Sequence, residues 1–219
     1  MYPGILTSVR TNFSDWEGTA LPGYDLRLQA ALDAAESVFA EKSYGLATMR
    51  DIAAAANLSV AGLYYYLPSK QRALGMVCGR AFQALSEGLE RALSEAALPD
   101  SQLRAFVRHH VGFITVSPAA YRVLLHDMEA LEGEDRLAVH EIRRRYFARA
   151  ADLVIAVQQE RTSSISTRIA TAALFGMMNW TPMWYRGENE SDASHVALEM
   201  STLFLRGVAA PAEEPAAIV

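Results

Sequence analysis

The sequence has little cysteine, no long apolar run and little net charge. Its single cysteine, Cys78, has no partner for an intramolecular disulfide, which is typical of proteins in the reducing cytoplasm. No apolar run approaches the roughly 20 residues that a membrane-spanning helix needs. The first 24 residues also lack the basic start and the apolar stretch of a secretory signal. We therefore expect a cytoplasmic protein without a membrane partner.

The sequence motifs of common enzymes are missing as well. The chain contains no GxSxG, no GxxxxGK, no HExxH and no cysteine pair. His109, His110, His126 and His140 include no pair at the i, i+4 spacing of a helical metal site, and Cys78 is expected to be buried or inert. We therefore expect no enzyme, no cofactor and no metal, although catalytic residues can also come together from distant parts of a chain.

The overall composition is that of an ordinary globular protein. Of the 219 residues, 51% are apolar and 21% are charged. The 20 basic and 25 acidic side chains give a formal net charge of −5. This acidic balance by itself argues weakly against nucleic acid as a partner.

The hydrophobic periodicity predicts an all-α fold. Apolar residues recur at three- and four-residue steps from Tyr24 onward, as at Leu28, Leu32 and Ala35, and no alternating strand pattern occurs. A flexible arm is expected over 1–24 and a disordered tail over 209–219. Outside the segment treated next, the expected helices cover 25–41, 70–96, 100–116, 119–131, 134–160, 164–185 and 193–208, with a chain break at Gly45.

The densest pattern lies in residues 48–70, which read TMRDIAAAANLSVAGLYYYLPSK. They predict one short helix over 49–56 and a second over 60–66. Asn57 falls in the turn, where asparagine tolerates a left-handed backbone. Two short helices joined by a tight turn form the helix-turn-helix plan, whose second helix enters the major groove of DNA.

The surface chemistry of this segment agrees with that plan. Thr48 and Ser59 are expected N-caps, at helix ends where phosphate binds well. The consecutive tyrosines 64–66 point about 100° apart on a helix, so they cannot all be core. At least one hydroxyl is expected to reach a phosphate or a base edge; the alternative is aromatic packing. Lys70 is a candidate phosphate contact.

The stretch from Leu28 to Leu74 resembles the N-terminal DNA-binding domain of TetR-type (TetR/AcrR) transcriptional regulators. The resemblance rests on VFAEKSYGLATMRDIAAAANLS followed by GLYYYLPSKQRAL. It implies a DNA-binding domain over 25–75, a helical ligand-binding and dimerisation domain over 76–208, and a homodimer that binds double-stranded operator DNA. The DNA contacts that it implies come from Thr48, Ser59, Val60, Ala61, Gly62, Tyr64, Tyr65 and Lys70.

The recognition helix departs from the common family pattern. Val60-Ala61-Gly62 stands where Lys-Gly-Thr is frequent, and Leu67 stands where Phe is frequent. Apolar contact with thymine methyl groups and readout of DNA shape are therefore expected to outweigh polar readout. Residues 1–75 carry six basic and seven acidic side chains, so phosphate neutralisation should contribute modestly.

Two apolar faces near the C-terminus are candidates for a dimer interface. The resemblance implies that the last two long helices pack against their twofold mates as a four-helix bundle, and small residues would permit close approach. The alternative is that these faces belong to the intramolecular core. The candidate interface residues are Ile165, Ile169, Ala173, Met177, Trp180, Val196, Met200, Leu203 and Phe204.

The segment GMMNWTPMWYRGENES resembles a subgroup of these regulators that respond to acyl-coenzyme A thioesters. A pocket for a long apolar ligand is built from Met, Phe and Trp walls with a few polar groups, and an arginine can bind the ligand's phosphates. Ordinary core packing and a solvated arginine face are the alternatives. The candidate effector residues are Phe106, His110, Phe113, His126, Met128, Arg145, Phe175, Met178 and Trp184.

Together these patterns predict a repressor that leaves a palindromic operator when a small apolar effector binds. Acyl-CoA or a related hydrophobic metabolite is the expected effector. The alternative is an all-helical enzyme or adaptor without DNA binding, which would explain the long helices but not residues 48–70.

Overall fold

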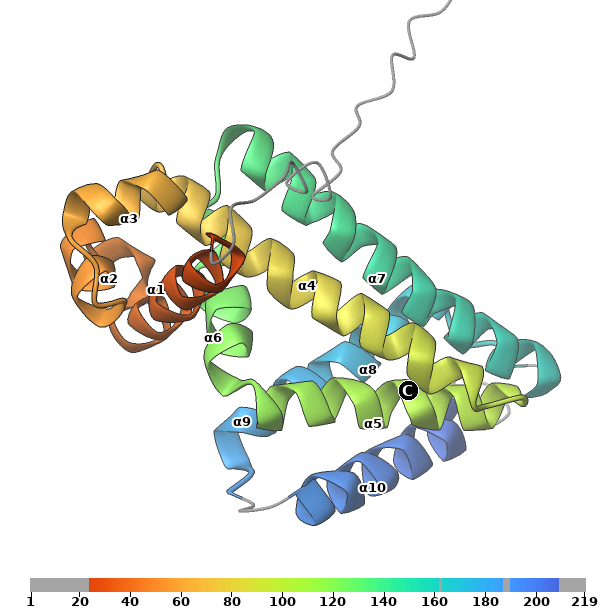
Figure 1. Cartoon of the computed structure of the whole chain (residues 1–219). Coiled ribbons are helices and arrows are strands. Elements are labelled where there is room, and N and C mark those ends of the chain that lie inside the picture. Colours follow the sequence, from red (N-terminus) through yellow and green to blue (C-terminus); the bar gives the residue numbers. More distant parts are fainter. Residues whose placement is uncertain (1–23, 162, 187–189, 209–219) are drawn as a thin grey trace, which may run out of the picture.

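The computed structural model describes residues 24–161, 163–186 and 190–208, and within these ranges every regular element is a helix (Figure 1). The predicted all-α fold is confirmed. Residues 1–23 of the predicted arm and the predicted tail lie outside the described residues. The elements are α1 (Tyr24–Leu46), α2 (Met49–Ala55), α3 (Val60–Tyr66), α4 (Lys70–Ser94), α5 (Pro99–Val116), α6 (Pro118–His126), a 3₁₀ turn (Met128–Ala130), α7 (Gly133–Arg161), α8 (Thr167–Asn179), α9 (Thr181–Trp184) and α10 (Glu190–Val208).

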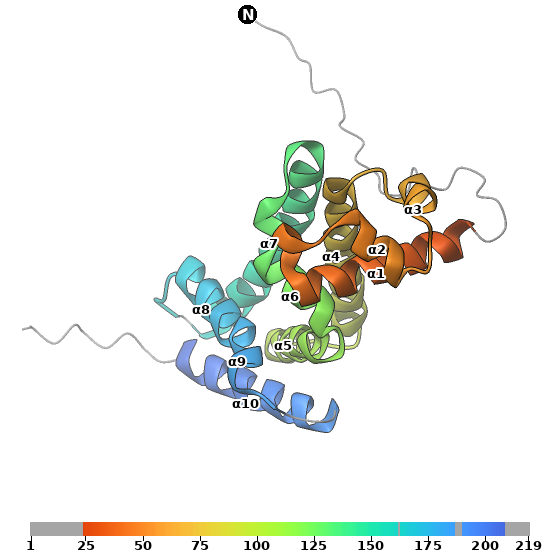
Figure 2. The same cartoon turned by 90° about the vertical axis from the view of Figure 1, so that its left-hand side faces the viewer.

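The helices α1, α2 and α3 gather at one end of the molecule with the start of α4 (Figures 1 and 2). Their shared core consists of fully buried apolar side chains, among them Phe39, Ile52 and Leu63. Burying such a side chain stabilises the fold by about 1.5–3 kcal/mol. This small core fixes the angle between α2 and α3.

The predicted caps of the short helices are confirmed. Thr48 and Asp51 form a capping box, with the Asp51 amide donating to Thr48 Oγ1 (3.2 Å) and the Thr48 amide donating to Asp51 Oδ2 (2.9 Å). Ser59 Oγ accepts from the Gly62 amide at 3.0 Å. Asn57 has φ 54°, the left-handed conformation predicted for the turn.

The predicted break at Gly45 is wrong, because the chain bends two residues earlier. Ser43 has φ 62° and ψ 156°, and helical structure resumes as far as Leu46. The bend removes the Tyr44 amide from the helical ladder, and that amide donates to Asp127 Oδ1 at the end of α6 (3.0 Å). A partner from another helix therefore sets the position of the bend.

The remaining helices form a larger body, and α4 runs into it from the first three helices. In this body α4 packs between α7 and α5, and α10 lies along α5 (Figures 1 and 2). The helix α6 also packs on α1 and so connects the body to the first three helices. None of the described helices is both long and apolar enough to cross a membrane.

Two predicted helices are divided in the structure. The stretch 119–131 becomes α6 and a 3₁₀ turn, and 164–185 becomes α8 and α9, separated at Trp180. Pro182 explains the second division, because proline has no amide hydrogen and its ring clashes with the preceding turn of a helix. The two divisions place the ends of α6 and α8 beside the cavity described below.

Specific contacts join the start of α4, which packs with α1, α2 and α3, to the larger body. Arg72 forms an ion pair with Asp135, and Gln71 Nε2 donates to the Ala130 carbonyl at 2.8 Å. Gly75 allows this approach, because a Cβ there would lie 2.7 Å from Asp135 Cγ. The first turns of α4 are thereby fixed to the start of α7.

Candidate functional site

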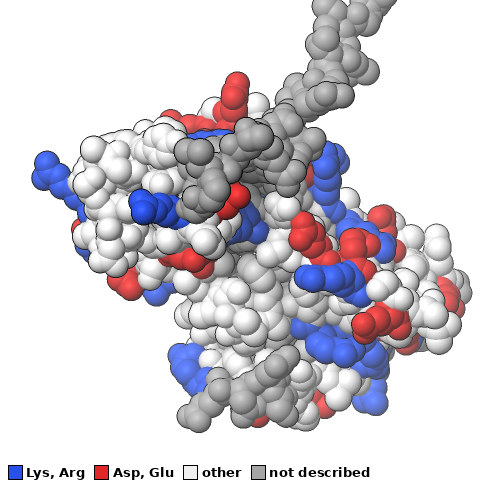
Figure 3. Space-filling model, in the orientation of Figure 1, with Lys and Arg blue, Asp and Glu red and all other residues white. Residues whose placement is uncertain are grey.

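The helix α3 lies at the surface with a mixed set of side chains. Leu63 and Tyr66 pack into the core, whereas Val60, Tyr64 and Tyr65 are exposed, Tyr65 by 66%. On the face shown in Figure 3, the end of the molecule with α2 and α3 is mostly uncharged. The helix thus offers apolar and hydroxyl groups, as its departure from the common family pattern predicted.

The three consecutive tyrosines have different environments. Tyr66 is buried and its ring meets the Tyr65 ring edge-on, with centroids 5.1 Å apart. Aromatic packing therefore describes Tyr66, while Tyr64 and Tyr65 present their rings to solvent. The remaining predicted DNA contacts in α3 and at its cap are Ser59 and Ala61, which are exposed, and Gly62, which is half-buried.

Two of the predicted phosphate contacts are already engaged inside the protein. The Lys70 ammonium donates to the carbonyls of Tyr44 (2.9 Å) and Ala47 (3.0 Å) and lies 4.4 Å from the Tyr44 ring centroid. Thr48 Oγ1 donates to Asp51 Oδ2 at 2.7 Å. Lys70 therefore fixes the α1–α2 connection and has one N–H beyond these two hydrogen bonds. At the start of α2, backbone amides are the groups that could bind a phosphate.

An ion pair strengthens the cap of α2. Lys42 Nζ lies 2.7 Å from Asp51 Oδ1. The hydrogen bond from Lys42, followed by those from Thr48, lowers the pKa of Asp51 to about 2. Asp51 thus stays ionised at the helix N-terminus, where the helix dipole favours a negative charge.

A cavity of about 130 Å³, open to solvent on one side, lies between α4, α5, α6, α7 and α8. His110, which is 5% exposed, is its central polar group. His110 Nε2 donates to Asn179 Oδ1 (3.0 Å), so that Nδ1 accepts from the Tyr146 hydroxyl (2.9 Å). Tyr121 also takes part, because its hydroxyl donates to the Asn179 carbonyl at 2.9 Å.

Burial dominates the electrostatics of this cavity. Desolvation lowers the pKa of His110 to about 4, so the ring is neutral at pH 7. Burial also raises the pKa of Tyr146. The cavity wall therefore combines neutral hydrogen-bonding groups and aromatic rings with one half-exposed ion pair, Arg143–Glu129. Its buried, neutral part suits an uncharged, partly apolar group.

Aromatic rings form much of the cavity wall. Phe147 and Phe175 stack with centroids 3.9 Å apart, and Phe175 meets the His110 ring edge-on at 5.5 Å. Phe106 lies directly behind, with its centroid 5.8 Å from that of Phe175. Rings packed this tightly hold a defined shape.

The predicted effector residues are divided among several places. His110, Met128 and Phe175 line the cavity, and Phe106 and Met178 are buried in the core of the same body. The other four lie elsewhere: His126 lines a groove between α1, α6 and α9, Phe113 lines a groove between α4 and α5, Trp184 lines a groove between α8 and α10, and Arg145 is an exposed partner of Glu141.

Sequence reasoning missed Tyr121, Tyr146 and Asn179 in the cavity. Asn179 interrupts an otherwise apolar run, GMMNW, and a polar residue at such a position is a usable signal because a buried amide needs partners. Tyr146 follows three arginines, and such a charged stretch predicts an exposed helix face and not a buried tyrosine.

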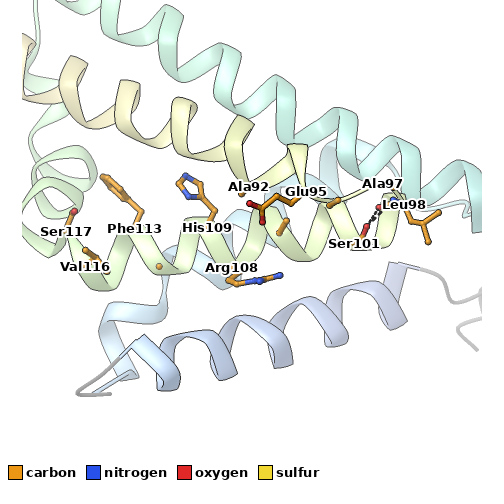
Figure 4. Close-up of a pocket in the computed structure, with 13 residues that line it drawn as sticks. Ala92, Glu95, Ala97, Leu98, Ser101, Arg108, His109, Phe113, Val116 and Ser117 are labelled. Carbon is orange, nitrogen blue, oxygen red and sulfur yellow. Dashed lines mark hydrogen bonds between the residues drawn. The ribbon is translucent and has the colours of Figure 1, made fainter.

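Surface grooves also border this body, three of which bear on the predicted residues. The α4–α5 groove, about 810 Å³, is lined by polar residues such as Arg108 and His109 and by exposed apolar residues such as Leu98 (Figure 4). The α1–α6–α9 groove has a volume of about 620 Å³, and the α8–α10 groove about 710 Å³. The α1–α6–α9 groove shares Tyr121 and Asn179 with the cavity.

Most of the predicted dimer residues lie on one partly exposed apolar face, formed by α8 with its flanking residues and by α10. Trp180 is 62% exposed and Leu203 67%, and Ile165, Ile169 and Ala173 are exposed as well. Met177, Val196 and Met200 are half-buried. Phe204 is buried within the chain, so for this residue the intramolecular alternative holds.

The single cysteine is buried and protonated. Burial raises the pKa of the Cys78 thiol to about 12, which keeps it protonated. Across 24–161, 163–186 and 190–208, no group of three or more His, Cys, Asp or Glu side chains is placed to hold a metal ion.

Comparison with known sequences identifies two family profiles in the chain. The profile described as "Bacterial regulatory proteins, tetR family" matches residues 31–72. The profile described as "Tetracyclin repressor-like, C-terminal domain" matches residues 96–208. No curated protein matches the chain.

Solved structures with a similar fold include PfmR of Thermus thermophilus, a TetR family transcriptional regulator. It is 28% identical, with a TM-score of 0.72 over 84% of this chain and 99% of that chain. A TetR-family regulator from Bordetella parapertussis 12822 is 24% identical, with a TM-score of 0.75 over 83% and 95%. AibR, in complex with isovaleryl coenzyme A and operator DNA, is 23% identical, with a TM-score of 0.73 over 81% and 97%.

Proposed function

Since this chain belongs to the TetR family and is a ligand-responsive transcriptional regulator, we propose that it acts as a cytoplasmic homodimeric repressor. The repressor leaves a palindromic operator when an effector binds. The observation that carries this proposal is the exposure of α3, which is fixed by its own core yet presents Val60, Tyr64 and Tyr65 outward. A helix held in this way can lie in a major groove.

The proposed DNA interface combines backbone and side-chain contacts. The free amides at the starts of α2 and α3 hold phosphates, and the tyrosine hydroxyls of α3 reach a phosphate or a base edge. Val60 and Ala61 contact thymine methyl groups. The interface comprises Thr48, Ser59, Val60, Ala61, Gly62, Tyr64, Tyr65 and Lys70.

We further propose that the apolar face of α8 and α10 pairs with its copy in a second chain. An exposed face with Ile169, Trp180 and Leu203 would be costly to leave in water. Small residues such as Ala173 and Gly176 allow the two copies of α8 to approach closely. The proposal requires that pairing puts the two α3 helices on one side of the dimer, because successive half-sites face the same side of the duplex.

The effector is proposed to be an acyl thioester that places its acyl group in the His110 cavity. The neutral histidine and the stacked rings suit an uncharged apolar group. AibR, a protein of the same fold, is known in complex with isovaleryl coenzyme A. Isovaleryl-CoA is therefore the first compound to test.

The helix α6 connects the cavity to the DNA-binding end. Tyr121 near its start is hydrogen-bonded to Asn179, and Asp127 just after its end accepts from the Tyr44 amide at the bend in α1. A ligand that displaces Tyr121 would therefore shift α6 and, through Asp127, the bend before α2. In this account the effector favours a conformation in which the two α3 helices are wrongly spaced.

The proposal is tested by mixing the purified protein with the DNA upstream of its own gene. We expect a specific, competitor-resistant mobility shift that is reversed by isovaleryl-CoA. An enzyme or an adaptor would give no specific shift. A specific shift that no acyl-CoA reverses would leave DNA binding standing and contradict the proposed effector.

A further inference from the structure

The groove between α1, α6 and α9 lies next to the His110 cavity. Both are lined by Tyr121, Leu125 and Asn179, so one layer of side chains separates a volume of about 130 Å³ from one of about 620 Å³. This layer is held by the hydrogen bond from the Tyr121 hydroxyl to the Asn179 carbonyl. Leu125, half exposed, lies on the groove side without a polar anchor.

The two volumes differ in what they can hold. With about 130 Å³, the cavity accommodates only a small part of a ligand, such as a short branched acyl group. Ligand sites in proteins usually have volumes of about 300–1,000 Å³. An acyl thioester therefore needs a second compartment for everything beyond its acyl group, and the groove has that size.

The charges around the groove indicate what this second part is. Arg122 and His126 stand one helical turn apart on α6, and Glu41 faces them from α1 together with Ser37. One cation, one anion, one histidine and the two hydroxyls of Ser37 and Tyr121 give no strong net field but offer both donors and acceptors. Such a rim favours a neutral arm with amides and hydroxyls over a highly charged group.

We propose that the α1–α6–α9 groove is the outer compartment of the effector site. It holds the neutral, amide-bearing arm of an acyl thioester whose acyl group occupies the His110 cavity. This inference rests on the proposed function and adds a consequence to it. The arm touches Ser37 and Glu41 on α1, so the effector contacts the DNA-binding end directly.

The other two grooves fit this role less well. The α4–α5 groove in Figure 4 shares no lining residue with the cavity. The α8–α10 groove also shares none and lies on the proposed dimer face. Trp180 lines the α1–α6–α9 groove and also belongs to that dimer face, so it is left unchanged in the test.

The test uses tryptophan to fill the groove without touching the cavity. Ser37→Trp and Ala119→Trp add bulk on α1 and α6, at residues that line the groove and not the cavity. Ala84→Trp, on an exposed position of α4 away from all of these pockets, is the matched control. Calorimetry measures the affinity for isovaleryl-pantetheine, which has the acyl group and the arm, and for isovaleryl-CoA, which adds the nucleotide.

We expect both groove variants to lose at least tenfold in affinity for both compounds, while Ala84→Trp stays within twofold of wild type. Operator affinity without any compound should be unchanged, which shows that the variants are folded. Arg122→Met, a change of one exposed side chain, should weaken isovaleryl-pantetheine by three- to tenfold.

Groove variants that bind both compounds as wild type does would overturn this inference and leave the proposed function intact. If wild-type protein binds isovaleryl-CoA but not isovaleryl-pantetheine, the nucleotide carries the recognition and the neutral arm is the wrong occupant. If wild type binds neither compound, the proposed effector class fails and the groove assignment fails with it.

Discussion

The end of the molecule formed by α1, α2 and α3 and the larger body place their polar groups in opposite ways. In α2 and α3, apolar residues such as Ile52 and Leu63 are buried and Tyr65 is turned outward. In the larger body the polar side chains of His110, Tyr146 and Asn179 are hydrogen-bonded to one another at the cavity, among aromatic rings. Substitutions at the surface of α3 should therefore change binding alone, whereas substitutions in the cavity should change stability and ligand response together.

The largest expected effect concerns the face that we propose as the dimer interface. Leu203→Glu places a charge in the proposed interface, where it would be desolvated without a partner, so the dimer should dissociate. Light scattering should report about half the wild-type mass. Leu98→Glu, at an equally exposed leucine on another surface, is the control and should keep the dimer. A Leu203→Glu protein of unchanged mass would contradict this interface.

The second expected effect is a dependence of stability on pH to which the cavity residue His110 contributes most. Burial lowers the pKa of His110 from 6.5 to about 4, so between these values the unfolded chain binds a proton that the folded chain does not. The contribution is complete above pH 6.5 and is lost as the pH falls towards 4, by about 3 kcal/mol in the free energy of unfolding.

This loss is isolated by comparing wild type with His110→Gln in denaturant titrations from pH 7 to pH 4. The difference in free energy of unfolding between wild type and His110→Gln should narrow by that amount as the pH falls. The corresponding difference between wild type and His109→Gln should narrow less, because His109 is only half-buried. Parallel curves for wild type and His110→Gln would show that His110 is not the group responsible.

Adjacent tyrosines in α3 should behave differently. Tyr65→Ala removes an exposed ring and should weaken operator binding by about 1–2 kcal/mol, roughly five- to thirtyfold, with the free energy of unfolding nearly unchanged. Tyr66→Ala removes a buried ring and should cost about 3 kcal/mol of stability. Unfolding curves and operator titrations on both variants check this. Wild-type operator affinity in Tyr65→Ala would remove that residue from the interface.

The smallest expected effect concerns the caps. Thr48→Ala removes a hydroxyl that both accepts from the Asp51 amide and donates to the Asp51 carboxylate, and should cost about 1 kcal/mol of stability. Ser69→Ala, which removes only the acceptor for the Arg72 amide, is the matched comparison. Chemical denaturation measures both. Equal losses would show that the second hydrogen bond at Thr48 contributes nothing.

The two regions also differ in how far the sequence predicts them. The caps, the Asn57 turn and the bounds of α3 were predictable because they depend on neighbours within four residues along the chain. The bend at Ser43 and the cavity were not, because their determinants lie far apart. Asp127 fixes the Tyr44 amide, and His110, Tyr146 and Asn179 come from three different helices. A local pattern identifies a capped helix but not the residue that a distant helix brings to it.

If the proposed function is right, two α3 helices of one dimer read successive turns of a duplex. Hydroxyl-radical footprinting on the DNA upstream of the gene measures this. We expect two protected patches related by twofold symmetry and centred one helical turn, about 34–36 Å, or a multiple of it apart. At the lowest concentration that protects fully with wild type, Tyr65→Ala should protect both patches only in part, and full protection should need a roughly five- to thirtyfold higher concentration. A single patch, or protection that Tyr65→Ala leaves unchanged, would contradict the account.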